Sequence, residues 1–286
     1  MYTYIRAFLC LALATMSLHL TSGLSIPHLE KRIINGFNMT DPLSPETVAV
    51  YRYIGTGKSN CGGTLISNNY AVTAAHCLIF KTDELYPAKN ISIGYNNKDR
   101  RLQTEATALD VIIHPEYFAS KRNAKFDIGV VKINPIEFNK NTKRMPIYDG
   151  PVYEGQNLLA MGWGAMEDGA KDPDMMRGVL VIAGNSTMCQ RFVPEFKDNN
   201  GPQICTLHAN TPYQTICQGD SGTGLAIAVG GKMMFAGLTS VTYNIDEFPC
   251  GNPTGAEFFV RISYQLDFIM KNTGLSKEYL LGEVDE

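Results

Sequence analysis

The segment Cys217-Gln218-Gly219-Asp220-Ser221-Gly222 decides how the chain is interpreted, because it places a serine in a tight turn between two glycines and near a cysteine. Glycine lets the backbone turn sharply enough to aim N–H groups at one point. A serine presented in this way becomes a nucleophile when an imidazole takes its proton and a carboxylate orients the imidazole. The segment alone is a common loop sequence, so the rest of the chain has to supply those two groups.

Two earlier segments supply an imidazole and a carboxylate. Ala71-Val72-Thr73-Ala74-Ala75-His76-Cys77 ends a predicted strand on a histidine beside a cysteine, and Asp127-Ile128-Gly129-Val130-Val131-Lys132 opens another on an aspartate. Each has an ordinary structural explanation when taken alone. Together with the serine turn they predict catalysis by an activated serine, and His76, Asp127 and Ser221 are the candidate catalytic residues.

The composition limits the class of protein. The chain has 286 residues, 44% apolar and 19% charged, so it can bury a large core and lacks the composition of a disordered chain. A net charge of −3 gives no basic face for nucleic acid, and no internal run reaches the roughly 18 apolar residues of a membrane span. His114 and His208 lack the spacing of metal ligands. We therefore expect a monomer with no nucleic-acid partner, membrane anchor, metal or other cofactor.

The first 32 residues are predicted to be removed during secretion. Residues 1–23 combine Arg6, an apolar run over 7–20 and small residues at the end, as in a secretory signal peptide. Residues 24–32 end in the dibasic pair Lys31-Arg32, directly before Ile33-Ile34-Asn35-Gly36, which predicts a propeptide cut after Arg32. The mature chain, residues 33–286, is then expected to be secreted and extracellular.

The cysteine count agrees with export. Cys10 leaves with the signal peptide, so six of the seven cysteines remain, an even set that predicts three disulfides. Six cysteines allow fifteen pairings, and spacing alone does not choose among them. Candidate N-glycosylation sites in a secreted chain are Asn38, Asn90 and Asn185.

Short apolar or alternating runs, separated by Gly, Asn, Pro and Asp, predict an all-β sandwich or barrel. Two helices are expected, over 186–193 and 264–272, and the acidic end, 277–286, is expected to be a loose tail. The predicted strands cover 63–66, 70–74, 110–113, 128–133, 158–161, 179–182, 225–229, 233–240 and 258–262.

Six motifs follow one another through residues 33–286: Ile33-Ile34-Asn35-Gly36, Cys61-Gly62-Gly63-Thr64-Leu65-Ile66-Ser67, Ala74-Ala75-His76-Cys77, Asp127-Ile128, Gly162-Trp163-Gly164 and Gly219-Asp220-Ser221-Gly222. In this order they closely resemble the trypsin/chymotrypsin family of serine proteases, which also has the order His, Asp, Ser. The resemblance implies two antiparallel six-stranded β-barrels, divided near residues 140–155, with the active site between them and a C-terminal α-helix.

The resemblance also implies a role for each site residue. His76 would be the general base, Asp127 its orienting carboxylate and Ser221 the nucleophile, with the backbone N–H groups of Gly219 and Ser221 as the oxyanion hole. The substrates would be proteins or peptides, and protease inhibitors are candidate partners.

Activation and cross-linking follow from the same resemblance. An activating processing protease would cut after Arg32, and the new ammonium group of Ile33 would pair with Asp220 and order the pocket. The implied disulfides are Cys61–Cys77, Cys189–Cys205 and Cys217–Cys250.

Specificity is where the chain departs from the family. Thr215 stands at the base of the primary pocket, where an aspartate selects Lys or Arg. Ser240, Val241 and Thr242 follow one wall, with Val241 in place of a tryptophan and Thr242 in place of a glycine. Glu257 replaces a small residue on the other wall. Several outcomes stay open: Glu257 binds a basic side chain, fills the pocket or points outward, and Thr242 narrows the entrance, which would favour small or medium apolar side chains.

A further departure is Thr223, which replaces a glycine after the nucleophile. The leading function is a secreted serine endopeptidase made as a zymogen. The alternative is a non-catalytic protease homologue that keeps the fold as a secreted binding or regulatory module. The complete triad of candidate residues favours the enzyme.

Overall fold

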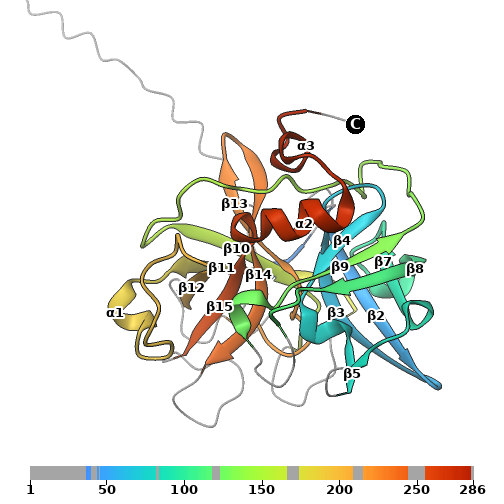
Figure 1. The fold of residues 1–286 in the computed structure, drawn as a ribbon, viewed down its shortest axis with the longest axis horizontal. Helices are drawn as coiled ribbons and strands as arrows, with labels where there is room; N and C mark the ends of the chain where they lie inside the picture. The colour runs from blue at the N-terminus through green and yellow to red at the C-terminus, as the bar shows by residue number, and fades with distance from the viewer. Residues whose placement is uncertain are drawn as a thin grey trace, which may run out of the picture.

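The computed structural model describes residues 37–39, 44, 46–81, 84–117, 123–165, 174–208, 215–243 and 255–284. Six antiparallel strands of the first half close into a barrel (Figure 1). In their order around the barrel they are β2 (Thr47–Ile54), β3 (Gly57–Leu65), β4 (Tyr70–Thr73), β9 (Gly129–Ile133), β8 (Thr104–Ile113) and β7 (Ile91–Tyr95).

Six strands of the second half form a second barrel, which the pairing of β11 with β12 closes. The strand β1 (Phe37–Asn38) pairs with the start of β11, on the edge opposite β10. The strands β5 (Ile79–Lys81) and β6 (Glu84–Leu85) form a separate hairpin. The barrel order is β11 (Arg177–Ala183), β10 (Asn157–Gly162), β13 (Gly224–Val229), β14 (Lys232–Tyr243), β15 (Ala256–Arg261) and β12 (Gln203–His208). The predicted fold class, two six-stranded barrels, is confirmed.

Each barrel is filled by its own apolar side chains. Val50, Leu65 and Val131 belong to the core of the first barrel, and Leu225 and Phe259 to that of the second. Bulky and branched side chains fill a six-stranded barrel completely, so the interior is a core and leaves no channel. The substrate site therefore has to lie outside the barrels.

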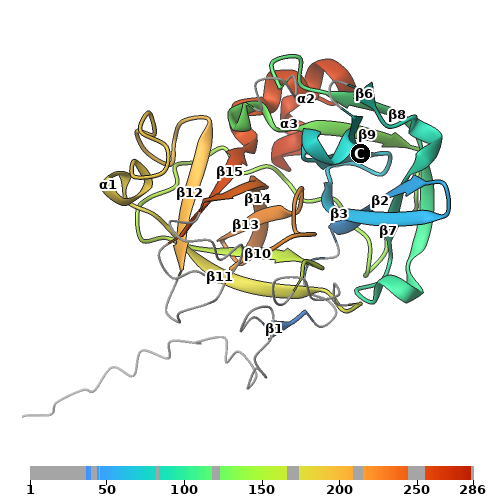
Figure 2. The ribbon, with the colours of Figure 1, turned by 90° about the horizontal axis from the view of Figure 1, so that it is seen from below.

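A third core joins the two barrels. It brings Tyr51 and Ile128 of the first barrel together with Met161 and Trp163 of the second. The Trp163 indole is 1% exposed, and its N–H donates to the Lys98 carbonyl at 2.8 Å. Figure 2 shows the barrels side by side, and β13 of the second contacts β3 of the first. This shared core fixes the barrels relative to each other, which a site built from both of them requires.

Three α-helices are described: α1 (Ser186–Cys189), α2 (Leu266–Thr273) and α3 (Lys277–Leu281). The predicted C-terminal helix is α2, and it ends at Gly274, which has φ 73°. The expectation of a loose tail over 277–286 is wrong for its described part. The Ser276 hydroxyl caps α3 by accepting the Tyr279 N–H, and Gly282 ends the helix at φ 78°.

The helix α3 is held on the segment that links the barrels, residues 134–156. The Ile147 N–H donates to the Leu280 carbonyl at 2.8 Å, and Leu280 is buried. Arg144 donates to the carbonyls of Tyr279 and Val284 and stacks on the Tyr279 ring at 4.1 Å. The acidic end was expected to be a loose tail, but Tyr279 and Leu280 within it are buried, and α3 bonds to the linker at Arg144 and Ile147.

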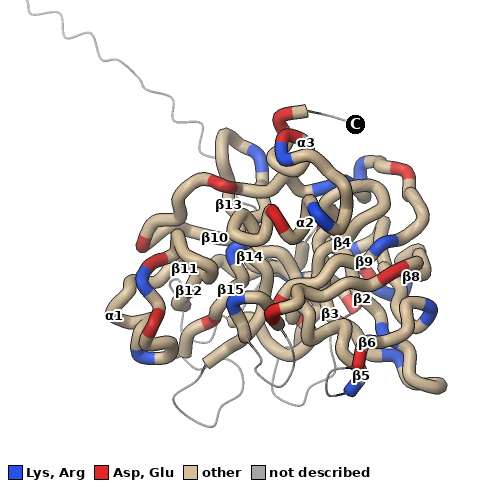
Figure 3. The backbone as a smooth tube through the Cα atoms, in the orientation of Figure 1, with Lys and Arg blue, Asp and Glu red and all other residues tan. Residues whose placement is uncertain are grey.

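Along the backbone in Figure 3, Lys and Arg positions are interspersed with Asp and Glu positions over both barrels. Among the described residues, none of the helices has the length and apolar content to cross a membrane.

Candidate active site

Strand pairing brings His76 and Asp127 together. The strand β4 runs antiparallel to β9, with Thr73 opposite Gly129, so the residues after β4 lie beside those before β9. His76 is in a short 3₁₀ helix, Ala75–Leu78, directly after β4, and Asp127 follows another, Ala124–Phe126. His76 Nδ1 lies 2.8 Å from Asp127 Oδ2. Two strand ends thus place the imidazole against the carboxylate.

Asp127 is 3% exposed, and its carboxylate accepts three hydrogen bonds. The main-chain N–H of His76 donates to Oδ1 at 3.0 Å, whereas the His76 ring and the Ser240 hydroxyl, at 2.7 Å, share Oδ2. Ser240 comes from β14, at the point where its register with β15 shifts. Such an irregularity redirects a side chain out of the regular alternation of a strand. Because donors reach both oxygens, the carboxylate is fixed and holds the proton of His76 on Nδ1, leaving Nε2 as a base.

His114 packs against the residues on either side of Asp127. The His114 ring stacks on Phe126 with 4.6 Å between ring centroids. The main-chain N–H of His114 donates to the Ile128 carbonyl at 3.0 Å. Burial lowers the pKa of His114 below its ordinary value, so near neutral pH this ring adds little positive charge beside the pair.

Ser221 comes from the other barrel, in the turn between Cys217 and β13. Its carbonyl accepts the N–H of Gly62 on β3 at 2.8 Å, and Cys77 Sγ lies 3.7 Å from the same oxygen. Gly222 has φ 82°, and a Cβ there would lie 2.3 Å from the Thr73 hydroxyl. The turn that bears Ser221 is therefore packed against β3 and β4, and a side chain at position 222 would clash with β4.

The backbone of the same turn offers two N–H groups. Gly219 has φ 96°, a conformation that glycine adopts readily. Within the described part of the chain, neither the N–H of Gly219 nor that of Ser221 has a main-chain acceptor. Both are available to a substrate oxygen, which is the requirement for an oxyanion hole.

Asp220 is 2% exposed and turns its carboxylate into the second barrel. Oδ1 accepts the Gly164 N–H at 2.7 Å, and Oδ2 accepts the Cys217 N–H at 2.9 Å. A Cβ at Gly164 would lie 2.3 Å from this carboxylate. The Gly162-Trp163-Gly164 motif thus makes room for the acid. Its predicted partner Ile33, and the predicted cleavage residue Arg32, lie outside the described residues.

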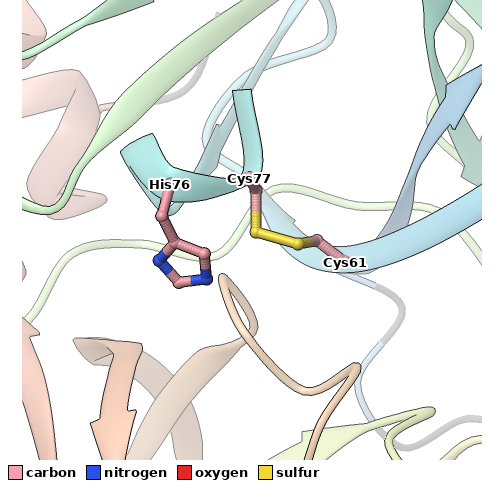
Figure 4. A group of neighbouring side chains, drawn as sticks. All are labelled: Cys61, His76 and Cys77. Atoms are coloured by element: carbon pink, nitrogen blue, oxygen red, sulfur yellow. A yellow bond between two sulfur atoms is a disulfide. The ribbon is translucent and has the colours of Figure 1, made fainter. Parts of the chain in front are cut away.

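Two of the three implied disulfides are present, Cys61–Cys77 and Cys189–Cys205. Cys217 is also disulfide-bonded, but its predicted partner Cys250 lies outside the described residues. Figure 4 shows the His76 ring next to the Cys61–Cys77 bridge. Three such side chains within 4.8 Å would be a candidate metal site. The bridge removes that possibility, because the sulfurs are bonded to each other and offer no thiolate.

Glu257 and Thr215 meet at the base of the predicted pocket. The Thr215 hydroxyl donates to Glu257 Oε1, and the Thr206 hydroxyl donates to Oε2 at 2.8 Å. Glu257 is 0% and Thr215 1% exposed. Thr206 of β12 and Thr242 of β14 flank Glu257 as its neighbours on the adjoining strands. The structure thus brings Glu257 into contact with Thr215, the residue predicted to be the pocket base, and buries both side chains.

A cleft of about 700 Å³ runs from His76 and Asp127 along the C-terminal end of β14. Ser240 and Val241, both predicted from the sequence, line it. No sequence motif indicates its other lining residues, which come from β5, the segment between β8 and β9, and the end of β14: Ile79, Phe80, Lys81, Tyr117, Ala124 and Tyr243. Thr206 was likewise missed, because its role depends on the register of β12 with β15.

The three candidate glycosylation sites are on the described surface. Asn38 is exposed, and Asn90 and Asn185 are partly exposed. Asn185 Oδ1 also caps α1 by accepting the Met188 N–H at 2.8 Å, which leaves Nδ2, the atom that carries a glycan, outside this hydrogen bond.

Known proteins share this arrangement. A family model described as Trypsin matches residues 33–269. Serine protease 1 of Drosophila melanogaster is 30% identical over 261 residues, covering 88% of this chain and 89% of its own length. Vitellin-degrading protease of Bombyx mori is 26% identical over 257 residues, covering 87% and 89%.

The fold matches as well. A solved structure of neuropsin, a serine protease expressed in the limbic system of mouse brain, superposes with a TM-score of 0.67 at 22% identity, covering 83% of this chain and 98% of that one. The family match spans both barrels and every predicted catalytic residue. This chain therefore belongs to the trypsin family of serine proteases.

Proposed function

We propose that the protein is a secreted serine endopeptidase, made as a zymogen, that hydrolyses peptide bonds through an acyl-enzyme. The observation that carries the proposal is the fixed pair His76–Asp127, with Nδ1 2.8 Å from Oδ2, against which the turn bearing Ser221 is seated. A non-catalytic homologue would have no need to keep this carboxylate fully hydrogen-bonded beside the imidazole. The alternative of a binding or regulatory module is not favoured.

The reaction follows from these atoms. Ser221 Oγ attacks the carbonyl carbon of the peptide bond while His76 Nε2 takes the hydroxyl proton. The carbonyl oxygen becomes an oxyanion and accepts the N–H groups of Gly219 and Ser221. His76 then gives its proton to the leaving amine, the C–N bond breaks, and an ester to Ser221 remains. Water, deprotonated by His76, hydrolyses the ester and restores the serine.

The test is covalent labelling of the mature chain with a fluorophosphonate, which reacts with activated serines. We expect labelling of the protein that begins at Ile33 and none of the Ser221→Ala variant. Failure of the mature wild-type protein to react, while it remains folded, would favour the binding module instead.

Two further proposals concern processing. The dibasic site at Lys31-Arg32 is the proposed point of activation, and residues 1–23 the proposed export signal. Expression of the full chain in a secreting eukaryotic cell checks both, through the N-terminal sequence and the glycan mass of the protein found in the medium.

For specificity we propose cleavage after Lys or Arg, with Glu257 supplying the negative charge. Its carboxylate contacts Thr215 at the pocket base, where a basic side chain would end. Thr242, one strand away, would narrow the entrance without blocking an unbranched side chain.

Replacing Glu257 with glutamine is expected to lower kcat/KM for Lys and Arg substrates by about 10²-fold, because a buried cation would lose its partner at a cost of about 3 kcal/mol. A peptide library read by mass spectrometry measures this preference in the wild type and the variant. Glu137→Gln changes an exposed carboxylate and is the matched control. A wild-type preference for small or medium apolar residues would instead support constriction by Thr242.

A further inference from the structure

Thr223 is a fully buried side chain within the nucleophile turn, and it has no part in the chemistry proposed above. We propose that Thr223 is a positioning residue: its hydroxyl fixes the peptide unit that carries the Ser221 N–H, and so aims one donor of the oxyanion hole. The inference rests on the proposed function, since it concerns the rate of that reaction.

The hydroxyl acts on the Asp220 carbonyl. This oxygen accepts the main-chain N–H of Thr223 at 3.0 Å and also the Thr223 hydroxyl at 2.7 Å. The Asp220 carbonyl and the Ser221 N–H belong to one planar peptide unit and point in opposite directions. The hydrogen bonds that fix the Asp220 carbonyl therefore also fix the direction of the Ser221 N–H.

The other donor is held by the same principle. The Gly219 N–H shares its peptide unit with the Gln218 carbonyl, which accepts the Ala165 N–H at 2.7 Å. The Gln218–Gly219 peptide unit is thus fixed by Ala165, and the Asp220–Ser221 peptide unit by Thr223. A glycine at position 223 would keep the main-chain hydrogen bond and lose the hydroxyl.

The methyl group of Thr223 has a separate, packing role. A Cβ built at Gly62 would lie 1.9 Å from Thr223 Cγ2, and one at Gly162 would lie 3.2 Å from it. Gly62 and Gly162 are in different barrels, so the methyl fills the space that these two glycines leave between them. The side chain therefore combines two functions that substitution can separate.

The test compares two pairs of variants that differ by one hydroxyl. Thr223→Val keeps the branched shape and loses the hydroxyl, while Thr223→Ser keeps the hydroxyl and loses the methyl. Thr223→Ala is compared with Thr223→Ser as a second pair, in case the valine variant does not fold. Mature proteins are assayed on a peptide that the wild type cleaves, and with a peptide aldehyde, whose adduct with Ser221 places an oxyanion in the hole.

We expect loss of the hydroxyl to lower kcat about tenfold in each pair, because one hydrogen bond that aims a transition-state donor is lost. KM should stay within about twofold, and the aldehyde should bind about tenfold more weakly, since the donor acts on the tetrahedral state. Thr223→Ser should keep kcat near that of the wild type. Loss of the methyl alone is expected to appear as a lower melting temperature.

Equal kcat and aldehyde affinity within both pairs, in an active wild-type background, would overturn this inference and leave the proposed function standing. The inference also fails if Thr223→Ser loses as much activity as Thr223→Val, because packing would then explain the effect. A mature wild-type protein with neither turnover nor an aldehyde adduct would overturn the proposed function, and this inference with it.

Discussion

Replacing Asp127 with asparagine is expected to lower kcat by about 10⁴-fold while the protein stays folded. The main-chain N–H of His76 donates to Oδ1, and this donor cannot reverse its role. The asparagine oxygen must therefore take that side and turn its NH₂ group toward the His76 ring. Nδ1 then has to accept a hydrogen bond, which puts the ring proton on Nε2. In that tautomer His76 cannot remove the Ser221 proton.

Single-turnover and steady-state kinetics of the mature variant measure this loss, and a thermal melt verifies that the fold is intact. Asp110→Asn makes the same chemical change at an exposed position on β8 of the same barrel, and should leave kcat unchanged. A loss of less than about tenfold in Asp127→Asn would contradict the role assigned to this carboxylate.

The second large effect is expected at Asp220. Its two oxygens accept main-chain N–H groups from opposite sides, Gly164 at Oδ1 and Cys217 at Oδ2. Whichever way an asparagine amide is turned, its NH₂ group faces one of these donors. The substitution also removes the charge proposed to pair with the freed amino group of Ile33. Breaking a buried pair of this kind costs about 3–5 kcal/mol, so we expect Asp220→Asn to lower kcat/KM by about 10²–10³-fold.

Fluorophosphonate labelling and turnover follow the activity, and near-ultraviolet circular dichroism follows the fold. Arg32→Gln, which blocks the proposed cleavage, provides an independent route to the same inactive state. An uncleaved Arg32→Gln protein with wild-type turnover would refute activation by cleavage. Wild-type turnover of a cleaved Asp220→Asn protein would refute only the role of this acid.

Local strand patterns predicted an all-β chain, and the resemblance carried by the six motifs predicted the two barrels and the pairing of His76 with Asp127. His76 and Asp127 stand at strand ends, and the antiparallel pairing of β4 and β9 brings such ends together. The serine turn has its own glycines. The strands β1, β2, β5, β6, β7 and β12 were not predicted. Three of them have only two or three residues, and β2 is buried at five consecutive positions, so these four lack the alternation of a half-buried strand.

The specificity wall could not be predicted in the same way. The contact of Glu257 with Thr206 and Thr215 depends on the register of β15 against β12 and β14, and a shift of one residue would place its side chain on the other face of β15. Ser240 donates to Asp127 because the register of β14 with β15 shifts at this residue, and no local sequence motif predicts that shift. These positions are set by pairings between distant segments, which only the folded chain displays.

The position of the C-terminal helix α3 decides which end of the chain can carry a tag. The last described residues lie at the upper edge of Figure 1, far from β5, which follows the 3₁₀ helix of His76 at the lower edge. A purification tag or fluorescent reporter belongs at this end, since the proposed mature amino terminus must remain free. A chain shortened to residue 269, where the family match stops, would lack Leu280 and uncover the linker around Ile147. The family match thus ends before residues that pack against the linker.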